Sequence, residues 1–222
     1  MAKMTIAQCK SAVFQLINQY SIAGTEVPLT YNDQADNNNR MLNLINDAQM
    51  TIATTSRPIE ETYTIEVPEK PLSERTLELE KEMPDDFIYA LGVYFKPNFG
   101  DRRWIRVPER TIDMDGYKWI GHRHFLYPDR PAGTWKIEYA RYPQRYDSTT
   151  PETTELDNEP DTHEAIPYYV AALLLLDENP YAYSSLHNLW ETKLTRLGYK
   201  PPHATSTRVA DVYGFDFFRG TW

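Results

Sequence analysis

Four side chains have the types and spacing that metal chemistry needs. In the run His122-Arg-His124, two imidazoles fall on the same side of a predicted strand, as two zinc ligands would. His187 and Glu191 are four residues apart on a predicted helix, a spacing that metal ligands share with ordinary pairs on a helix surface. No third ligand is recognisable beside either pair. We therefore interpret all four as surface residues and expect no metal site.

The carboxylates offer no clearer catalytic pattern. The chain has 32 Asp and Glu residues, but sequence context links no two of them as a general acid and a general base. The pairs and near pairs are Asp85, Asp86, Asp113, Asp115, Glu155 and Asp157. The sequence has no Gly-Lys-Thr phosphate loop, no Gly-x-Ser-x-Gly elbow and no His-Glu-x-x-His motif. We expect no enzyme, no catalytic residue and no cofactor, with a hydrolase that uses scattered carboxylates as a distant alternative.

The middle of the chain has the apolar period of strands. From Glu60 to Tyr142 the period changes from 3.6 to 2, with Pro, Gly and Asp turn signals between the segments. The predicted strands are Thr62 to Val67, Phe87 to Phe95, Arg103 to Val107, Tyr117 to Leu126 and Thr134 to Arg141. This pattern predicts a small antiparallel β module.

Helical spacing of apolar residues is found on both sides of this module. The predicted helices are Thr5 to Tyr20, a second one that the Asn-rich stretch 32–39 opens and that Ser56, Arg57 and Pro58 stop, Ala165 to Leu176, and Tyr183 to Leu197. Thr5 is placed as an N-cap and Gly198 as a C-cap. The third helix should be central, because Leu173 to Leu176 cover every face of one turn.

The expected fold is α+β and mainly α: a four-helix bundle with an inserted antiparallel β module and an extended C-terminal tail. The expected parts are an N-terminal helix pair (1–59), the β module (60–143), a C-terminal helix hairpin that completes the bundle (144–198) and an aromatic docking tail (199–222).

Composition limits the function. A formal net charge of −9 argues against a protein that grips nucleic acid, because phosphate binding needs a concentrated basic face, and only 101–106 approaches one. Cys9 is the only cysteine, which excludes an intrachain disulfide. No apolar run approaches the roughly 20 residues of a membrane helix, and the first residues lack the regions of a signal peptide. We expect a soluble protein made in a cytoplasm.

The C-terminal tail is rich in aromatic residues. Its large rings follow a Pro, Thr and Ser stretch with too few apolar residues to form a core of its own. We interpret them as anchors that dock into a partner or a neighbouring copy; alternatives are that they fold back onto their own core or add a strand to a partner sheet. These rings belong to Tyr213, Phe215, Phe217, Phe218 and Trp222.

Several segments together resemble the head-tail connector adaptors of tailed bacteriophages. They are the Thr-Ile-Ala-Gln-Cys-Lys helix from Thr5, the helix that ends in Ile52-Ala53, the run Ile137-Glu-Tyr-Ala-Arg-Tyr-Pro143, and His163-Glu-Ala-Ile-Pro-Tyr-Tyr-Val-Ala-Ala172. The resemblance covers most of the chain up to Leu197. The long stretch after Gly198 departs from the shorter ends of minimal family members.

The resemblance implies a structural virion protein at the neck, the head-tail interface, made in the host cytoplasm. Copies of such adaptors form a ring, usually of twelve, beneath the portal protein. The implied partners are the portal protein, further copies of the chain, and a tail or second neck protein below. The ring continues the DNA channel without sequence-specific binding and without a membrane, and the acidic balance predicts a net negative lumen.

The alternative is a carbohydrate-binding module of a virion or secreted protein. In it, aromatic residues on a β face would stack on sugars, although core packing explains the same residues more simply. Those aromatic residues are Trp104, Tyr117, Trp119 and Trp135.

Overall fold

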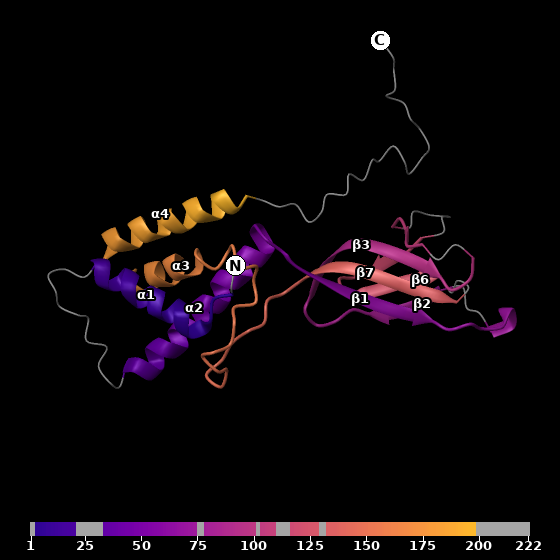
Figure 1. Ribbon diagram of the computed structural model, residues 1–222, viewed down its shortest axis with the longest axis horizontal. Helices are drawn as coiled ribbons and strands as arrows, with labels where there is room; N and C mark the ends of the chain where they lie inside the picture. Colours follow the sequence, from indigo (N-terminus) through magenta and orange to yellow (C-terminus); the bar gives the residue numbers. More distant parts are fainter. Residues whose placement is uncertain are drawn as a thin grey trace, which may run out of the picture. The chain divides into compact units, whose positions relative to one another are not determined.

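The computed structural model describes residues 3–20, 33–74, 78–100, 103–109, 116–128 and 132–198. They form two compact units, each with its own hydrophobic core. The helical unit contains the chain up to Ile59 and from Tyr142 to Gly198, and the β unit contains Glu60 to Arg141 (Figure 1). The predicted tail and its five aromatic residues lie outside the described residues.

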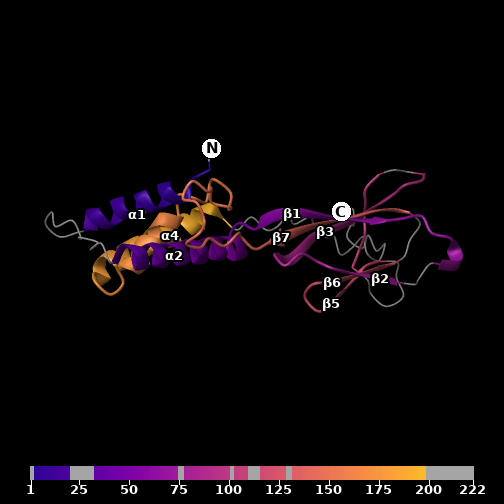
Figure 2. The same cartoon turned by 90° about the horizontal axis from the view of Figure 1, so that it is seen from below.

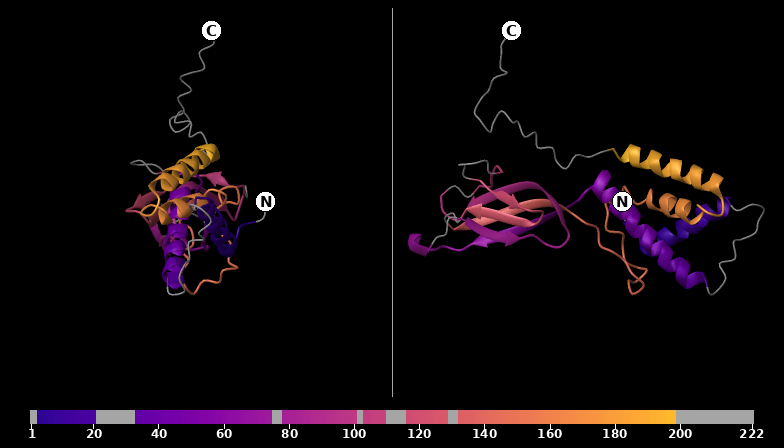
Figure 3. Two further views of the ribbon diagram at one scale, coloured as in Figure 1. Left: turned by 90° about the vertical axis from the view of Figure 1, so that its left-hand side faces the viewer. Right: turned by 180° about the vertical axis from the view of Figure 1, so that it is seen from behind.

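The helical unit contains four helices in its described part. They are α1 (Ile6–Tyr20), α2 (Asp33–Thr55), α3 (Ile166–Leu174) and α4 (Pro180–Leu197). The shortest, α3, packs against the other three and lies between α4 and the α1–α2 pair, as the second view of Figure 3 shows. Its predicted central position is confirmed, because Ile166, Val170, Ala171 and Ala172 are fully buried. The reason given for the prediction is wrong, because α3 ends at Leu174 and Leu176 is 42% exposed.

Local sequence signals set the helix ends. At the start of α1, the Gln8 N–H donates to Thr5 Oγ1 (3.2 Å) and the Thr5 N–H donates to Gln8 Oε1 (2.9 Å), which is a capping box. At the start of α4, Asn179 Oδ1 accepts from the Ala182 N–H at 3.1 Å. That helix ends at Gly198, whose φ of 64° is easily adopted only by glycine. The predicted caps Thr5 and Gly198 are therefore confirmed.

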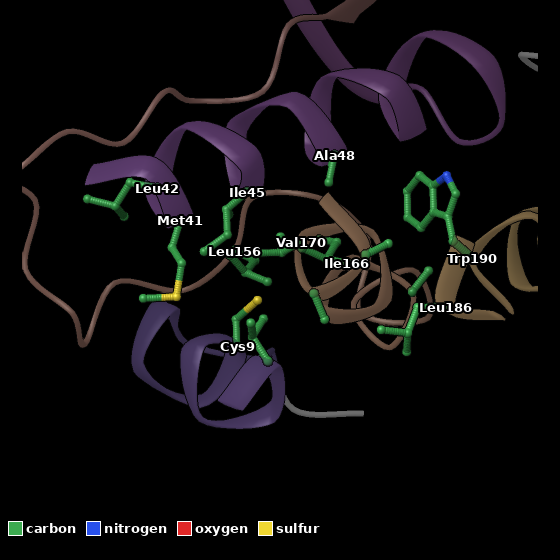
Figure 4. Packing of buried hydrophobic residues seen from close by; sticks show 14 of the residues in the cluster. Cys9, Met41, Leu42, Ile45, Ala48, Leu156, Ile166, Val170, Leu186 and Trp190 are labelled. Atoms are coloured by element: carbon green, nitrogen blue, oxygen red, sulfur yellow. The ribbon is translucent and has the colours of Figure 1, made fainter. Parts of the chain in front are cut away.

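The core of the helical unit draws on all four helices and on the segment that returns from the β unit. Cys9 of α1, Ile45 of α2 and Val170 of α3 point toward one another, together with Leu156 of the returning segment (Figure 4). Trp190 of α4 is 2% exposed and closes the other end of this core. Burying such side chains stabilises the fold by about 1.5–3 kcal/mol each.

The β unit contains two antiparallel sheets. The four-stranded sheet has the order β1-β7-β3-β4, and the three-stranded sheet has the order β2-β6-β5. The strands are β1 (Ile59–Val67), β2 (Glu78–Glu82), β3 (Phe87–Pro97), β4 (Ile105–Arg106), β5 (Lys118–Ile120), β6 (His124–Pro128) and β7 (Gly133–Arg141). Figure 2 shows the sheets as separate layers, with β1, β3 and β7 in one and β2, β5 and β6 in the other.

An aromatic core fills the space between the sheets. Trp135 of β7 is fully buried, and its ring centroid lies 5.8 Å from that of Phe125 and 5.5 Å from that of Tyr127, both on β6. Phe95 of β3 lies 5.0 Å from the same indole. Aromatic pairs at these distances add about 0.5–1.5 kcal/mol each beyond the area that they bury.

The predicted fold class is wrong. The described residues contain four helices together with seven strands in two antiparallel sheets, so the protein is not a four-helix bundle with a small inserted module. The sequence did not reveal the second sheet, because β2 is Glu-Leu-Glu-Lys-Glu and only Leu79 of it is half-buried. Rings such as Phe125 and Trp135 need apolar cover on both sides, and a second layer provides it.

Candidate interaction surfaces

The structure places the two histidines of the run 122–124 in separate local contacts. The predicted strand Tyr117 to Leu126 is in fact the hairpin of β5 and β6, which turns at Gly121 with a φ of 63°. His122 lies in this turn and its ring contacts Phe87 at 5.9 Å, while His124 Nδ1 lies 2.7 Å from Glu80 Oε1. No group of three or more His, Cys, Asp or Glu side chains in the described part of the chain could hold a metal ion.

His187 and the candidate carboxylates are distributed over separate local contacts. The His187 ring packs on Tyr183 at 5.5 Å within α4. Asp85 pairs with Arg123 at 2.7 Å, and Asp86 accepts the Tyr139 hydroxyl at 3.4 Å. Asp157 accepts the Gln144 N–H at 2.8 Å. Glu155 lies beside Thr5 in an isolated β-bridge. Asp113 and Asp115 lie outside the described residues.

A buried polar network, which sequence reasoning missed, fixes the returning segment to α2. The Asn46 side chain donates to the Tyr146 carbonyl at 2.8 Å and accepts from the Tyr146 N–H at 2.9 Å. Gln49 is fully buried, and its Oε1 accepts from the Asp157 N–H at 3.0 Å. Asn158, also fully buried, donates through its side chain to the Gln49 carbonyl at 3.2 Å. No sequence motif distinguishes these amides from exposed ones.

His163 ties the same segment to the N-terminus. Its Nδ1 accepts the Met4 N–H at 3.0 Å, so its Nε2 carries the proton and donates to the Asn158 carbonyl at 2.9 Å. Burial lowers the pKa of His163 below its ordinary value of 6.5, with a smaller lowering from Lys3, while Asp161 and Glu155 and the bond to Asn158 act in the opposite direction. The neutral ring is a structural link and is not aimed at a cavity.

The helical unit has a shallow hollow between α1, α3 and α4. Its volume is about 330 Å³, and its lining includes Leu16 and Gln19 of α1 and Tyr168 of α3. Lys193 of α4 crosses its rim, where Nζ lies 3.3 Å from Glu164 Oε2 and 5.0 Å from the Tyr168 ring centroid. The Lys193 cation is thus already paired with a carboxylate and stacked on a ring.

Large apolar side chains are exposed on both units. The most exposed one of the helical unit is Tyr181 at the start of α4, at 81%. In the β unit, Phe99 is 65% exposed, Ile105 53% and Trp104 41%. Of these residues, sequence reasoning singled out only Trp104, for sugar stacking, and noted the run 101–106 as approaching a basic cluster; it singled out neither Phe99 nor Ile105.

Two lysine side chains lie near the Trp104 ring. Lys96 Nζ lies 5.8 Å and Lys136 Nζ 5.2 Å from its ring centroid, and Lys136 also lies 4.6 Å from the ring of Tyr94. Arg106 of β4 pairs in register with Tyr94. Lys136 is also paired with Glu138 at 2.7 Å, so the surface around Trp104 combines aromatic rings with charges of both signs.

The four aromatic residues considered for sugar binding do not share one exposed face. Trp135 is fully buried, and Tyr117 and Trp119 are half-buried against the aromatic core. Only Trp104 among the four is exposed.

None of the helices in the described part of the chain is long and apolar enough to cross a membrane. No model of a protein family matches the chain, and no curated protein matches it. The described residues thus define a protein with one helical unit and one two-sheet β unit, whose exposed apolar residues lie among charges. The likeness to connector adaptors stays a prediction from the sequence.

Proposed function

We propose that this protein is a structural virion protein, a head-tail connector adaptor. Copies would form a ring, usually of twelve in such adaptors, which joins the portal protein to the tail or to a second neck protein. The ring would continue the channel for DNA at the virion neck. The proposal assigns the protein interfaces and no catalysis.

One observation carries the proposal: large apolar side chains are exposed on both units. Tyr181 of the helical unit and Phe99, Trp104 and Ile105 of the β unit are exposed by 41% to 81%. Apolar residues ringed by polar ones are typical of protein–protein contact sites. A ring subunit needs such surfaces on two flanks.

The residues behind the resemblance give further support. The run 163–172 supplies His163, which links three parts of the helical unit, and the buried Ile166 and Val170 at its centre. A similar run in an adaptor would be expected to organise its helices in the same way.

The acidic balance of the chain supports a role beside passing DNA. With a net charge of −9, the protein repels the phosphate backbone, so a channel wall formed by acidic faces would not retain DNA.

The test is the copy number of the chain relative to portal protein in purified virions, measured by quantitative mass spectrometry with labelled peptides from both units. We expect a ratio near one. Absence of the chain from the particle would overturn the proposal. A capsid protein quantified in the same digest serves as the control for recovery.

A further inference from the structure

The β unit is electrically asymmetric along its sequence. Residues 60–86 contain ten acidic and three basic residues, whereas residues 87–141 contain six acidic and ten basic ones. The first stretch includes β1 and β2, and the second includes the other five strands. In the four-stranded sheet, β1 of the acidic stretch lies at one edge and β4 of the basic stretch lies at the other.

One edge of the four-stranded sheet is acidic. The edge strand β1 exposes Glu60 and Glu66, and Glu69 is exposed just after it; these three residues are named the acidic edge. Glu66 faces away from the second sheet, because its neighbours Ile65 and Val67 are buried in the core between the sheets. Glu66 and Glu69 form no ion pair within the described part of the chain, so both charges are available to a partner.

The opposite edge is basic and partly apolar. Strand β4 exposes Arg106, with Arg103 just before it and Lys96 on the adjacent strand β3; these three residues, with Trp104 and Ile105 between them, are named the basic edge. Trp104 and Ile105 are exposed by 41% and 53%. Tryptophan and arginine are the residues most enriched in the energetic centres of interfaces.

The two patches lie on the two terminal strands of the sheet. In the order β1-β7-β3-β4 of the described strands, β1 and β4 are the edge strands, where a strand of another chain can approach. The acidic edge alone offers no apolar centre, and the basic edge alone repels its own copy. Each edge matches the other in sign, because one carries three carboxylates and the other three cations.

We propose that the basic edge of the β unit binds the acidic edge of a second copy of this chain. The two patches lie on opposite edges of one sheet, so the contact is heterologous and repeats head to tail. Such a contact closes into a ring when the rotation between copies allows it. Only the closure into a ring rests on the proposed function. The contact between two copies is inferred from the opposite charges of the acidic edge and the basic edge.

The test uses full-length chains with exchanged charges. In one variant, K96E/R106E, both edges are acidic; in the other, E66K/E69K, both are basic. Sedimentation velocity at about 0.05 M salt, where screening is weak, should show association of the wild type. Each variant alone should associate at least about tenfold more weakly, because like charges then meet. An equimolar mixture should associate again, because its edges alternate in sign.

The matched controls carry the same charge changes on the helical unit: K3E/R196E and E159K/E178K, all at exposed positions. They should associate like the wild type. Far-ultraviolet circular dichroism establishes that every variant is folded.

Three outcomes would overturn this contact: variants that associate as well as the wild type, a mixture that stays monomeric, or a wild type that is monomeric at low salt. The first would leave the ring itself standing, because copies would then meet through other surfaces. The virion copy number tests the neck assignment separately.

Discussion

His163 makes the stability of the helical unit depend on pH. Because its pKa is lower in the folded chain than the ordinary 6.5, mainly through burial, the unfolded chain takes up the proton first as the pH falls. The contribution of the neutral His163 ring to the free energy of unfolding is complete above about pH 6.5. It is lost as the pH falls below that value. The charged ring cannot accept the Met4 N–H, because both of its nitrogens then donate.

We expect urea unfolding to show this loss between about pH 7 and pH 5 in the wild type. H163Q should be less stable at pH 7 by about 1–3 kcal/mol, because buried partners lose their hydrogen bonds, and its stability should fall less over this range. Equal slopes for H163Q and the wild type would contradict the assignment.

Cys9 is predicted to be chemically silent in the folded protein. It is fully buried, and burial raises the pKa of its thiol to about 12, with a small opposite effect of Lys10. Reaction with a thiol reagent needs the thiolate and therefore an opening of the core. We expect the native rate to be at least about a thousandfold below the rate in denaturant. Rapid stoichiometric labelling with the helical signal retained would disprove this.

At the level of elements, the sequence predicted those features that depend on interactions between near neighbours in the chain. The α1 and α4 helices and their caps follow from Thr5, Gln8 and Gly198, whose interactions are with near neighbours in the chain. The second sheet depends on contacts between distant segments, such as Glu82 opposite His124, and no local pattern shows them. The turn at Gly121 needs a positive φ, which sequence alone does not specify.

The candidate surfaces were less predictable than the helices. The basic run 101–106 was visible, but exposure of Ile105 and burial of Trp135 depend on which strand faces the second sheet. Similarly, the amides of Asn46 and Gln49 look like surface residues until the returning segment covers them.

The pairing of β3 with β7 depends on the absence of a side chain at Gly133. A Cβ there would lie 2.6 Å from the Lys96 carbonyl oxygen and 2.5 Å from the Phe95 ring. We expect G133A to destabilise the β unit by about 1–3 kcal/mol, because a backbone oxygen cannot move aside as a side chain can. Thermal unfolding followed by near-ultraviolet circular dichroism measures this loss.

G92A is the matched control on the neighbouring strand. The three atoms nearest to its Cβ would all belong to the outer end of the Tyr94 side chain, the closest at 2.9 Å. The end of a flexible side chain shifts more easily than a backbone oxygen does. G92A should therefore lower the free energy of unfolding by less than G133A. If G92A destabilised the β unit more than G133A, the close approach of Gly133 to the Lys96 carbonyl would not be the contact that restricts the packing of β3 against β7.

On the scale of the whole molecule, the C-terminal segment is the part whose role the sequence predicts and the described residues do not include. Its opening Pro, Thr and Ser stretch has too few apolar residues to form a core of its own. We therefore predict that deletion of Pro201 to Trp222 leaves the fold and the unfolding midpoint unchanged. Under the proposed function the same deletion should weaken attachment to the portal protein, because the five aromatic anchors are lost.

Co-sedimentation with portal rings measures that attachment. A chain with the five aromatic residues replaced by serine keeps the length and tests the rings alone. A truncated chain that unfolds, or one that attaches as well as the intact chain, would refute the docking role of this segment.

The helical unit is interrupted in sequence by the whole β unit, and this affects its synthesis. The β unit is one continuous stretch and is complete on the ribosome before α3 emerges. The α1 and α2 helices precede α3 by roughly a hundred residues, which at typical rates takes about 5–20 s. During that time Ile45 and the neighbouring apolar residues of α2 lack the helix that will cover them. The nascent chain is therefore most exposed to aggregation, and most in need of a chaperone, while its β unit is being made.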